Sequence, residues 1–161
     1  MAIPKKYVPN VLTKTDAKKQ KSYISKSRKM YKKGNYFNRP KVVSYKTRKS
    51  RHVNKAKKVY NIDNVVPNKE LAKKCQCTLK TLKKIVNKGR GAYYSSGSRP
   101  NQSAESWGLA RLGSALTGGY SSVIDFHLLH EGCNHDGKAY KMAKQTCKTM
   151  GRCRKYLEAK P

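Results

Sequence analysis

The chain has 161 residues, which suffice for one ordinary domain with an extension and give no reason to expect two enzymatic domains. Thirty-eight Lys and Arg stand against eight Asp and Glu, so the net charge is +30. This charge exceeds what solubility requires and predicts a polyanionic or acidic partner, because self-repulsion destabilises the free compact state.

The first 60 residues are the most cationic segment, with twenty basic side chains and a single acid. Thr15 and Asp16 predict the start of a helix that ends at Gly34, because side-chain oxygens cap helix starts and glycine suits helix ends. Ser50 predicts the start of a second helix. Both helices have few apolar residues, so we expect an arm that orders against a partner or against the rest of the chain.

The composition becomes more globular from Val65, where Pro67 and Asn68 mark a boundary. The sequence therefore predicts a mainly α protein, in which residues 1–64 form an extended, basic, partly helical arm and residues 65–161 form a small compact helical domain with a helical hairpin. The helices expected in this domain cover residues 68–74, 78–88, 102–117, 122–132 and 138–157.

Three of these helices carry further expectations. The helix over 102–117 is the best candidate for the core, and its expected core side chains are Trp107, Leu112 and Leu116. Ser122 and Asp125 have the spacing of a capping box, although a strand over 123–129 is the alternative. Gly151 is expected to weaken the middle of the last helix.

Residues 71–86 have the pattern of a helix-turn-helix. Lys80, Lys83 and Lys84 would then face outward, where they can contact phosphates. Gln76 stands in place of the usual turn glycine, and no set of Gln, Asn and Arg side chains is displayed for reading base edges. The segment is therefore either a pair of helices that binds the nucleic-acid backbone or a structural helical hairpin.

Residues 89–102 read GRGAYYSSGSRPNQ and are predicted to form a loop, because of their glycines and proline. Arg90, Arg99, the hydroxyls and backbone NH groups can hold a phosphate or carboxylate there. The alternative is a buried loop that packs beside Trp107 and bonds to itself. Other cations expected at an anionic or nucleic-acid surface are Arg28, Lys29, Arg48 and Arg51.

The five cysteines are an odd number in a chain without an apolar secretory signal, and no apolar run reaches roughly 20 residues. We therefore expect a soluble, non-secreted protein with reduced thiols, although one disulfide is compatible with the count. Structural zinc is an alternative for Cys75, Cys77, Cys133 and the nearby histidines, but the Cys-x-Cys spacing does not fit common zinc sites.

The scattered acids suggest no paired-carboxylate site, and the Ser, Cys and His residues follow no recognisable catalytic motif. A nucleophile pair of Cys133 and His135 is conceivable, as is a nucleic-acid enzyme that uses Arg90 and Arg99. The expectation is nevertheless a protein without enzymatic activity, cofactor, metal or small-molecule substrate.

The segment Gly89–Gln102 continues through Ser106–Trp107, Ala110–Arg111 and Gly118–Gly119. With Leu12, Asp16, Gln20, Ser27, Gly34–Asn35–Tyr36 and Arg39, this pattern resembles an uncharacterised protein family of giant viruses, algal viruses and other large DNA viruses and phages. The resemblance covers most of the chain and supplies no catalytic residues.

The resemblance implies a viral setting, in which small basic proteins line the capsid, bridge it to an internal membrane or compact the genome. We expect a virion protein, a minor capsid or inner-capsid component whose partners are other capsid proteins and, in addition, viral DNA or the anionic inner membrane. The alternative is a sequence-tolerant DNA-binding or genome-packaging protein. The sequence does not separate the two locations.

Overall fold

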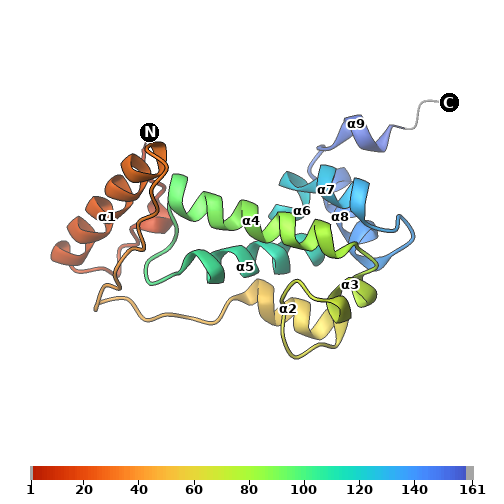
Figure 1. Ribbon diagram of the computed structural model, residues 1–161, viewed down its shortest axis with the longest axis horizontal. Coiled ribbons are helices and arrows are strands. Elements are labelled where there is room, and N and C mark those ends of the chain that lie inside the picture. Colours follow the sequence, from red (N-terminus) through yellow and green to blue (C-terminus); the bar gives the residue numbers. More distant parts are fainter. Residues whose placement is uncertain (1, 159–161) are drawn as a thin grey trace. The chain divides into compact units, whose positions relative to one another are not determined.

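The computed structural model describes residues 2–158, in which the chain is mainly α-helical, as predicted (Figure 1). A 3₁₀-helix, η1 (Lys5–Tyr7), precedes nine α-helices in this part of the chain. They are α1 (Lys14–Lys32), α2 (Arg51–Tyr60), α3 (Lys69–Cys75), α4 (Leu79–Ser95), α5 (Ala104–Leu116), α6 (Tyr120–Ile124), α7 (Phe126–Gly132), α8 (Lys138–Thr149) and α9 (Arg154–Leu157). None of these helices is long and apolar enough to cross a membrane.

The described residues form two compact units. Residues 2–48 and 88–108 make up the first unit, and residues 49–87 and 109–158 make up the second unit. Helices α4 and α5 contribute residues to both. This division differs from the expected one after residue 64, because the first part of the basic arm shares a unit with residues 88–108 and α2 belongs to the second unit.

Helix α1 begins slightly earlier than predicted, because Thr13 is its cap. The Thr13 hydroxyl accepts a hydrogen bond from the backbone NH of Asp16 at 3.2 Å. The helix ends at Lys32, close to Gly34 as expected. Its buried residues are Asp16, Gln20, Ile24 and Ser27. Three of these four are polar, so hydrogen bonds rather than apolar contacts must hold most of this face.

Helices α2 and α3 begin as the sequence predicts. The Ser50 hydroxyl accepts from the backbone NH of Val53 at 3.3 Å, and the Asn68 side chain accepts from the NH of Leu71 at 2.9 Å. Each bond satisfies a backbone donor that the first turn of a helix leaves without a partner.

Helix α4 is longer than predicted, because it continues through Gly89 to Ser95. The prediction of a loop over residues 89–102 is therefore wrong for its first seven residues. A Cβ atom at Gly89 would lie only 2.5 Å from the Cα of Gly108. Gly89 thus permits the close approach of α4 and α5 within the first unit instead of ending the helix.

The predicted helix through Phe126, Leu128 and Leu129 is confirmed as α7, which ends at Gly132 as expected. Its predicted start at Ser122, the capping box and the alternative strand are wrong, because residues 120–124 form a separate short helix, α6. Ser122 lies inside α6, where its hydroxyl donates to the carbonyl of Gly119 at 2.6 Å. Asp125 lies between the helices and is completely buried. Its carboxylate accepts two hydrogen bonds of 2.8 Å from the Arg111 guanidinium, a pairing that local sequence does not reveal.

The last predicted helix is interrupted rather than weakened. Helix α8 ends at Thr149, and α9 begins at Arg154. Between them, Gly151 has a φ of 63°, a left-handed conformation that a continuous helix does not contain.

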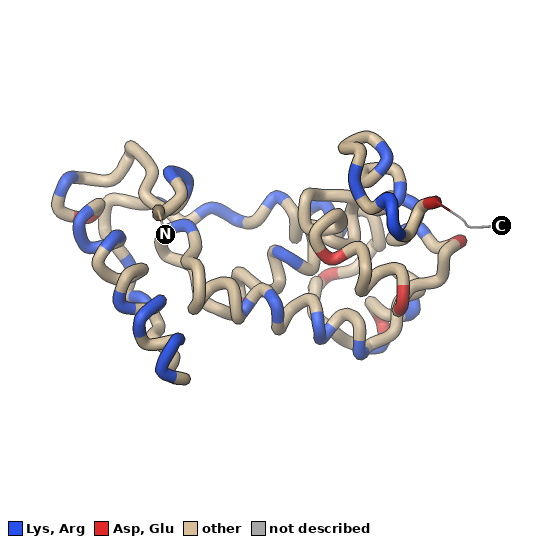
Figure 2. Tube along the Cα trace, turned by 90° about the horizontal axis from the view of Figure 1, so that it is seen from above, with Lys and Arg blue, Asp and Glu red and all other residues tan. Residues whose placement is uncertain are grey.

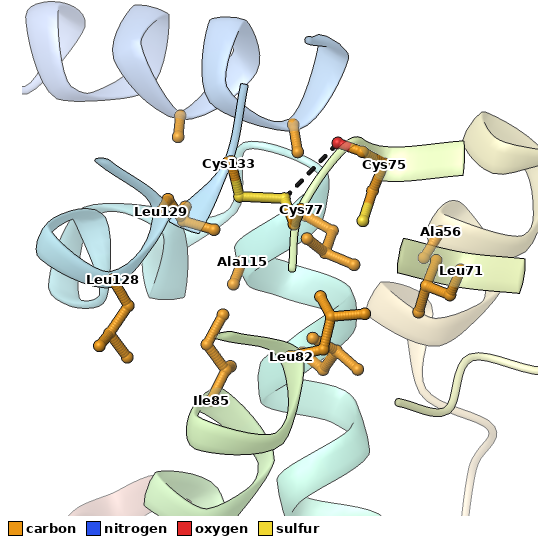
Figure 3. Close-up of a cluster of buried hydrophobic side chains, with 14 of the residues drawn as sticks. Ala56, Leu71, Cys75, Cys77, Leu82, Ile85, Ala115, Leu128, Leu129 and Cys133 are labelled. Carbon is orange, nitrogen blue, oxygen red and sulfur yellow. Dashed lines mark hydrogen bonds between the residues drawn. A yellow bond between two sulfur atoms is a disulfide. The ribbon is translucent and has the colours of Figure 1, made fainter. Parts of the chain in front are cut away.

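An apolar core fills the second unit (Figure 3). Leu112 and Leu116 are fully buried in it, as predicted, together with Leu82 and Ile85 of α4. Trp107 instead belongs to the first unit, where it is half-buried and its ring lies edge-on to Tyr7, with 5.9 Å between the centroids. The prediction of Trp107 as a core residue beside the two leucines is therefore wrong.

Four of the five cysteines form disulfides, contrary to the expectation of reduced thiols. Cys77 is bonded to Cys133, and Cys147 is bonded to Cys153. The first bond lies among the apolar side chains of the core (Figure 3). Cys75 is free and buried, and burial raises the pKa of its thiol to about 11. An odd count in the sequence could not show which sulfurs meet in the fold.

Candidate polyanion-binding surfaces

The first unit is built on a polar contact between α1 and the loop over residues 96–103, which joins α4 to α5. The side-chain amide of Gln20 donates to the carbonyl of Ser98 at 3.3 Å. The hydroxyl of Ser27 donates to the carbonyl of Tyr94 at 2.9 Å. The polar face of α1 therefore satisfies backbone acceptors of the loop and of the end of α4.

Arg39 lies at the centre of this contact, with only 8% of its surface exposed. Its guanidinium donates to the carbonyl of Tyr93 and the hydroxyl of Ser98, both at 2.7 Å, and to the hydroxyl of Ser27 at 3.1 Å. It also lies 3.7 Å from the centroid of the Tyr93 ring. We call Arg39, Ser27, Tyr93 and Ser98 the Arg39 cluster. Burial lowers the pKa of the guanidinium below its usual value, and none of these partners is a carboxylate.

Two side chains fix the stretch that follows Arg39. Asn101 accepts from the NH of Val42 at 2.7 Å and donates to the carbonyl of Tyr45 at 2.8 Å. Asp16 accepts from the NH and the hydroxyl of Ser44 at 2.8 and 2.5 Å. These bonds lower the pKa of the Asp16 carboxyl. The arm is thus ordered within its own unit.

Arg90 and Arg99, predicted to hold an anion at this loop, and Arg28, predicted as a further contact with an anionic surface, have different environments. Arg90 forms an ion pair with Glu105, with 2.9 Å between its Nε and the carboxylate. Arg28 donates from Nε to the carbonyl of Ser96 at 2.8 Å. Arg99 is exposed. The alternative of a loop that packs and bonds within the molecule accounts for these contacts, and anion binding at Arg99 stays a prediction.

In the second unit, α3 and α4 follow one another through a turn over residues 76–78, as the helix-turn-helix pattern predicts. Gln76 adopts the left-handed conformation, with φ 56° and ψ 40°, that a turn glycine usually takes. Lys80, Lys83 and Lys84 are exposed, as predicted. Their side chains are therefore accessible to an anionic surface.

The turn is also tied to the segment that follows α7. The carbonyl of Gln76 accepts from the NH of Asn134 at 2.8 Å, next to the disulfide between Cys77 and Cys133. These contacts fix the start of α4, where the three lysines stand. These contacts are compatible both with a structural helical hairpin and with a pair of helices that binds the nucleic-acid backbone.

The remaining predicted contact residues are exposed but are distributed over both units. Lys29 on α1 and Arg48 belong to the first unit, and Arg51, the first residue of α2, belongs to the second. Their role in binding stays a prediction.

Cations outnumber acids most strongly in the first unit. Its described residues include eighteen Lys and Arg and two acids, against nineteen and six in the second unit. In Figure 2 the basic positions recur along the chain, whereas acidic positions are few. Both acids of the first unit have a partner within it. Asp16 accepts a hydrogen bond from Ser44, and Glu105 pairs with Arg90.

Sequence reasoning missed the role of Arg39, Gln20 and Asn101 in building the first unit. One signal was present, because Asp16, Gln20 and Ser27 have the spacing of one helix face. A polar face on a helix with few apolar residues indicates a buried partner that is itself polar.

Two histidines of the second unit, His130 and His135, contact the ring of Tyr140. The Nδ1 atom of His130 lies 3.0 Å from the Tyr140 hydroxyl, and the His135 ring stacks on Tyr140 with 4.0 Å between centroids. Burial raises the pKa of Tyr140. Among residues 2–158, no three His, Cys, Asp or Glu side chains are grouped so that they could hold a metal ion.

Comparison with curated proteins and with solved structures gave no match. A family described as "Family of unknown function (DUF5824)" matches residues 4–124. The match covers α1 to α6, including the Arg39 cluster and the exposed lysines of α4. Because it extends over most of the chain, the protein belongs to this family of unknown function.

Proposed function

We propose that the protein is a non-enzymatic structural component of a large DNA virus particle, a minor capsid or inner-capsid protein that binds polyanionic or acidic surfaces. The observation that carries this proposal is the charge of the first unit. It has eighteen cations and two acids, and both acids are already engaged inside the unit. The remaining cations repel one another unless an external anion neutralises them.

The internal hydrogen bonds of the first unit support this role, because they leave most of its lysines outside the folded framework. Arg39 and Arg28 hold the loop, and Arg90 holds Glu105. Most of the other basic side chains are exposed. A fixed backbone that carries many exposed cations suits a bridge between acidic capsid faces, lipid phosphates or DNA.

The disulfides are also compatible with this role. Disulfides persist in oxidising settings, which include the surfaces of virions, and are rare in the reducing interior of cells. A protein that works inside a released particle can keep Cys77–Cys133 and Cys147–Cys153 oxidised.

Mass spectrometry of purified particles would test the proposal directly. We expect the protein in intact particles and, after detergent removes the membrane, in the fraction that contains the shell. Its absence from purified particles would contradict the proposal. Its exclusive recovery with the genome would favour the second candidate below.

The second candidate is a sequence-tolerant DNA-binding protein, and the exposed lysines of α4 favour it. Lys80, Lys83 and Lys84 stand just after a turn that is fixed by a disulfide and a hydrogen bond. Lysines at the start of such a helix can contact phosphates without reading bases.

A salt titration separates this candidate from general charge attraction. If the three lysines each contact a phosphate, replacing all three by Gln should reduce the slope of log affinity against log salt for duplex DNA by about 2.7. The matched control replaces Lys141, Lys144 and Lys148 of α8, which changes the charge equally. Equal changes in both variants would exclude a specific role for α4.

A further inference from the structure

Four tyrosines of the first unit form a continuous aromatic cluster, which we call the tyrosine cluster: Tyr31, Tyr36, Tyr93 and Tyr94. The ring centroids of Tyr31 and Tyr36 are 6.2 Å apart, those of Tyr36 and Tyr94 are 4.9 Å apart, and those of Tyr94 and Tyr93 are 5.0 Å apart. Exposure differs within the cluster, because Tyr93 is 1% exposed whereas Tyr31 and Tyr36 are 38% and 66% exposed. The cluster therefore has a buried inner end and an open outer end.

The inner end is held firmly. The Arg39 guanidinium covers the Tyr93 ring, and the Arg39 backbone NH donates to the Tyr93 hydroxyl at 3.1 Å. The hydroxyl of Tyr94 donates to the side chain of Asn38 at 2.8 Å. Because its neighbours are fixed, Tyr36 can remain in place although most of its ring is exposed.

The charges near this cluster in the sequence are positive. Lys32 and Lys33 directly follow Tyr31 at the end of α1 and are exposed. The ammonium of Lys26 lies 4.4 Å from the ring centroid of Phe37, the residue next to Tyr36. The two acids of the unit already have partners, because Asp16 accepts from Ser44 and Glu105 pairs with Arg90.

We infer that the tyrosine cluster binds single-stranded nucleic acid, whose bases stack on the exposed rings of Tyr36 and Tyr31 while lysines at the end of α1 contact the phosphates. Aromatic rings in a cationic surface bind single strands in this way, because every base has a face that can stack. A duplex hides these faces, and acidic protein or lipid surfaces lack them. The inference rests on the polyanion-binding part of the proposed function and adds the class of ligand.

The test measures binding of the full chain to a labelled oligothymidylate of about 12 nucleotides and to an abasic strand of equal length and charge. We expect the oligothymidylate to bind more tightly. Tyr36→Ala should weaken its binding about tenfold and should leave abasic binding unchanged. Tyr36→Phe should retain the affinity, because the ring remains.

The control variant is Tyr120→Ala, which removes an exposed tyrosine of the second unit and should change neither affinity. The fluorescence of Trp107, the single tryptophan, reports whether the first unit of each variant remains folded. The comparison of the two strands on the natural chain needs no variant, so it tests stacking even if Tyr36→Ala disturbs the fold.

The outcomes separate the two proposals. Equal, salt-sensitive binding of both strands, unaffected by Tyr36→Ala, would overturn stacking and leave polyanion binding in place. A loss of both affinities in Tyr36→Ala with an unchanged Trp107 signal would also overturn stacking, because the abasic strand has no base to stack. If neither strand, nor heparin, nor anionic vesicles bind, both this inference and polyanion binding fail.

Discussion

The two units show two ways in which a strongly cationic chain can hold a fold. The second unit has an apolar core, including Leu82, Leu112 and Leu116, and two disulfides. The first unit buries few large apolar side chains and is organised by polar groups around Arg39. Burial of apolar surface stabilises the second unit without direction, whereas the first depends on a few hydrogen bonds whose geometry must be right.

This difference matters because buried charged groups are sensitive to the loss of a single partner. Removing an apolar side chain leaves a cavity that neighbours can partly fill. Removing Arg39 leaves buried acceptors such as the Tyr93 carbonyl without a donor. The comparison therefore predicts that a substitution destabilises the first unit mainly through lost hydrogen bonds and the second unit mainly through lost apolar contacts.

The largest effect is expected from the long disulfide of the second unit. Cys77 and Cys133 are 56 residues apart, so replacing both by Ala should reduce the free energy of unfolding by about 4 kcal/mol through loop entropy. The control is the Cys147 and Cys153 pair, only 6 residues apart, whose loss should cost about 2 kcal/mol. Urea unfolding followed by circular dichroism measures both.

The same experiment tests whether the units are distinct in stability. Trp107 fluorescence reports on the first unit, whereas the lost disulfide lies in the second unit. The urea midpoint of the fluorescence change should therefore move less than the midpoint of the circular-dichroism change. Equal displacement of the two midpoints would mean that both units unfold together.

A somewhat smaller loss is expected when Arg39 is replaced in the first unit. Arg39→Ala should reduce the free energy of unfolding by about 3 kcal/mol, because hydrogen bonds from a buried charge are lost and their acceptors stay buried. The Trp107 unfolding midpoint is the measurement. Arg99→Ala, at an exposed position of the same loop, serves as the control and should change stability by less than about 0.5 kcal/mol.

Alkaline pH should weaken the second unit through Cys75. Burial raises the pKa of the folded thiol from 9.0 to about 11, so the unfolded chain loses this proton at lower pH than the folded chain. The stabilisation is complete below pH 9 and is lost as the pH rises through 11, by about 3 kcal/mol. Cys75→Ala should remove this part of the pH dependence of unfolding. Identical pH profiles for both proteins would contradict the assignment.

The smallest effect concerns Asp16 in the first unit. Ser44 lowers the pKa of the Asp16 carboxyl, so the stabilisation is present above the ordinary pKa and is lost as the pH falls through the folded value. The Trp107 urea midpoint should therefore fall in acid for the natural chain, and fall less steeply for Asp16→Asn. Identical acid profiles for the natural chain and for Asp16→Asn would show that the bonds to Ser44 contribute nothing to stability.

The sequence predicted the helical class and several helix starts, because caps at Ser50 and Asn68 depend only on neighbouring residues. It failed at Gly89, where a glycine that usually ends a helix allows a second helix to approach. It also failed at the cysteines, since pairing depends on distances between residues far apart in the chain.

For the same reason, the sequence predicted some residues of the candidate surfaces and missed others. The outward direction of Lys80, Lys83 and Lys84 follows from helical spacing and is confirmed. The position of Arg39 depends on partners up to 59 residues away, which no local pattern encodes. The tyrosine cluster likewise combines α1, the stretch after it and α4.

The bond between Cys77 and Cys133 joins the part of the chain that the family match covers to a part beyond residue 124. A fragment cut at that limit would keep one sulfur without its partner and would lose Phe126 and Leu129, which are buried in the second unit. The stretch that the family match covers is therefore shorter than the stretch that the second unit needs to fold. Expression of residues 4–124 alone would yield an unstable protein.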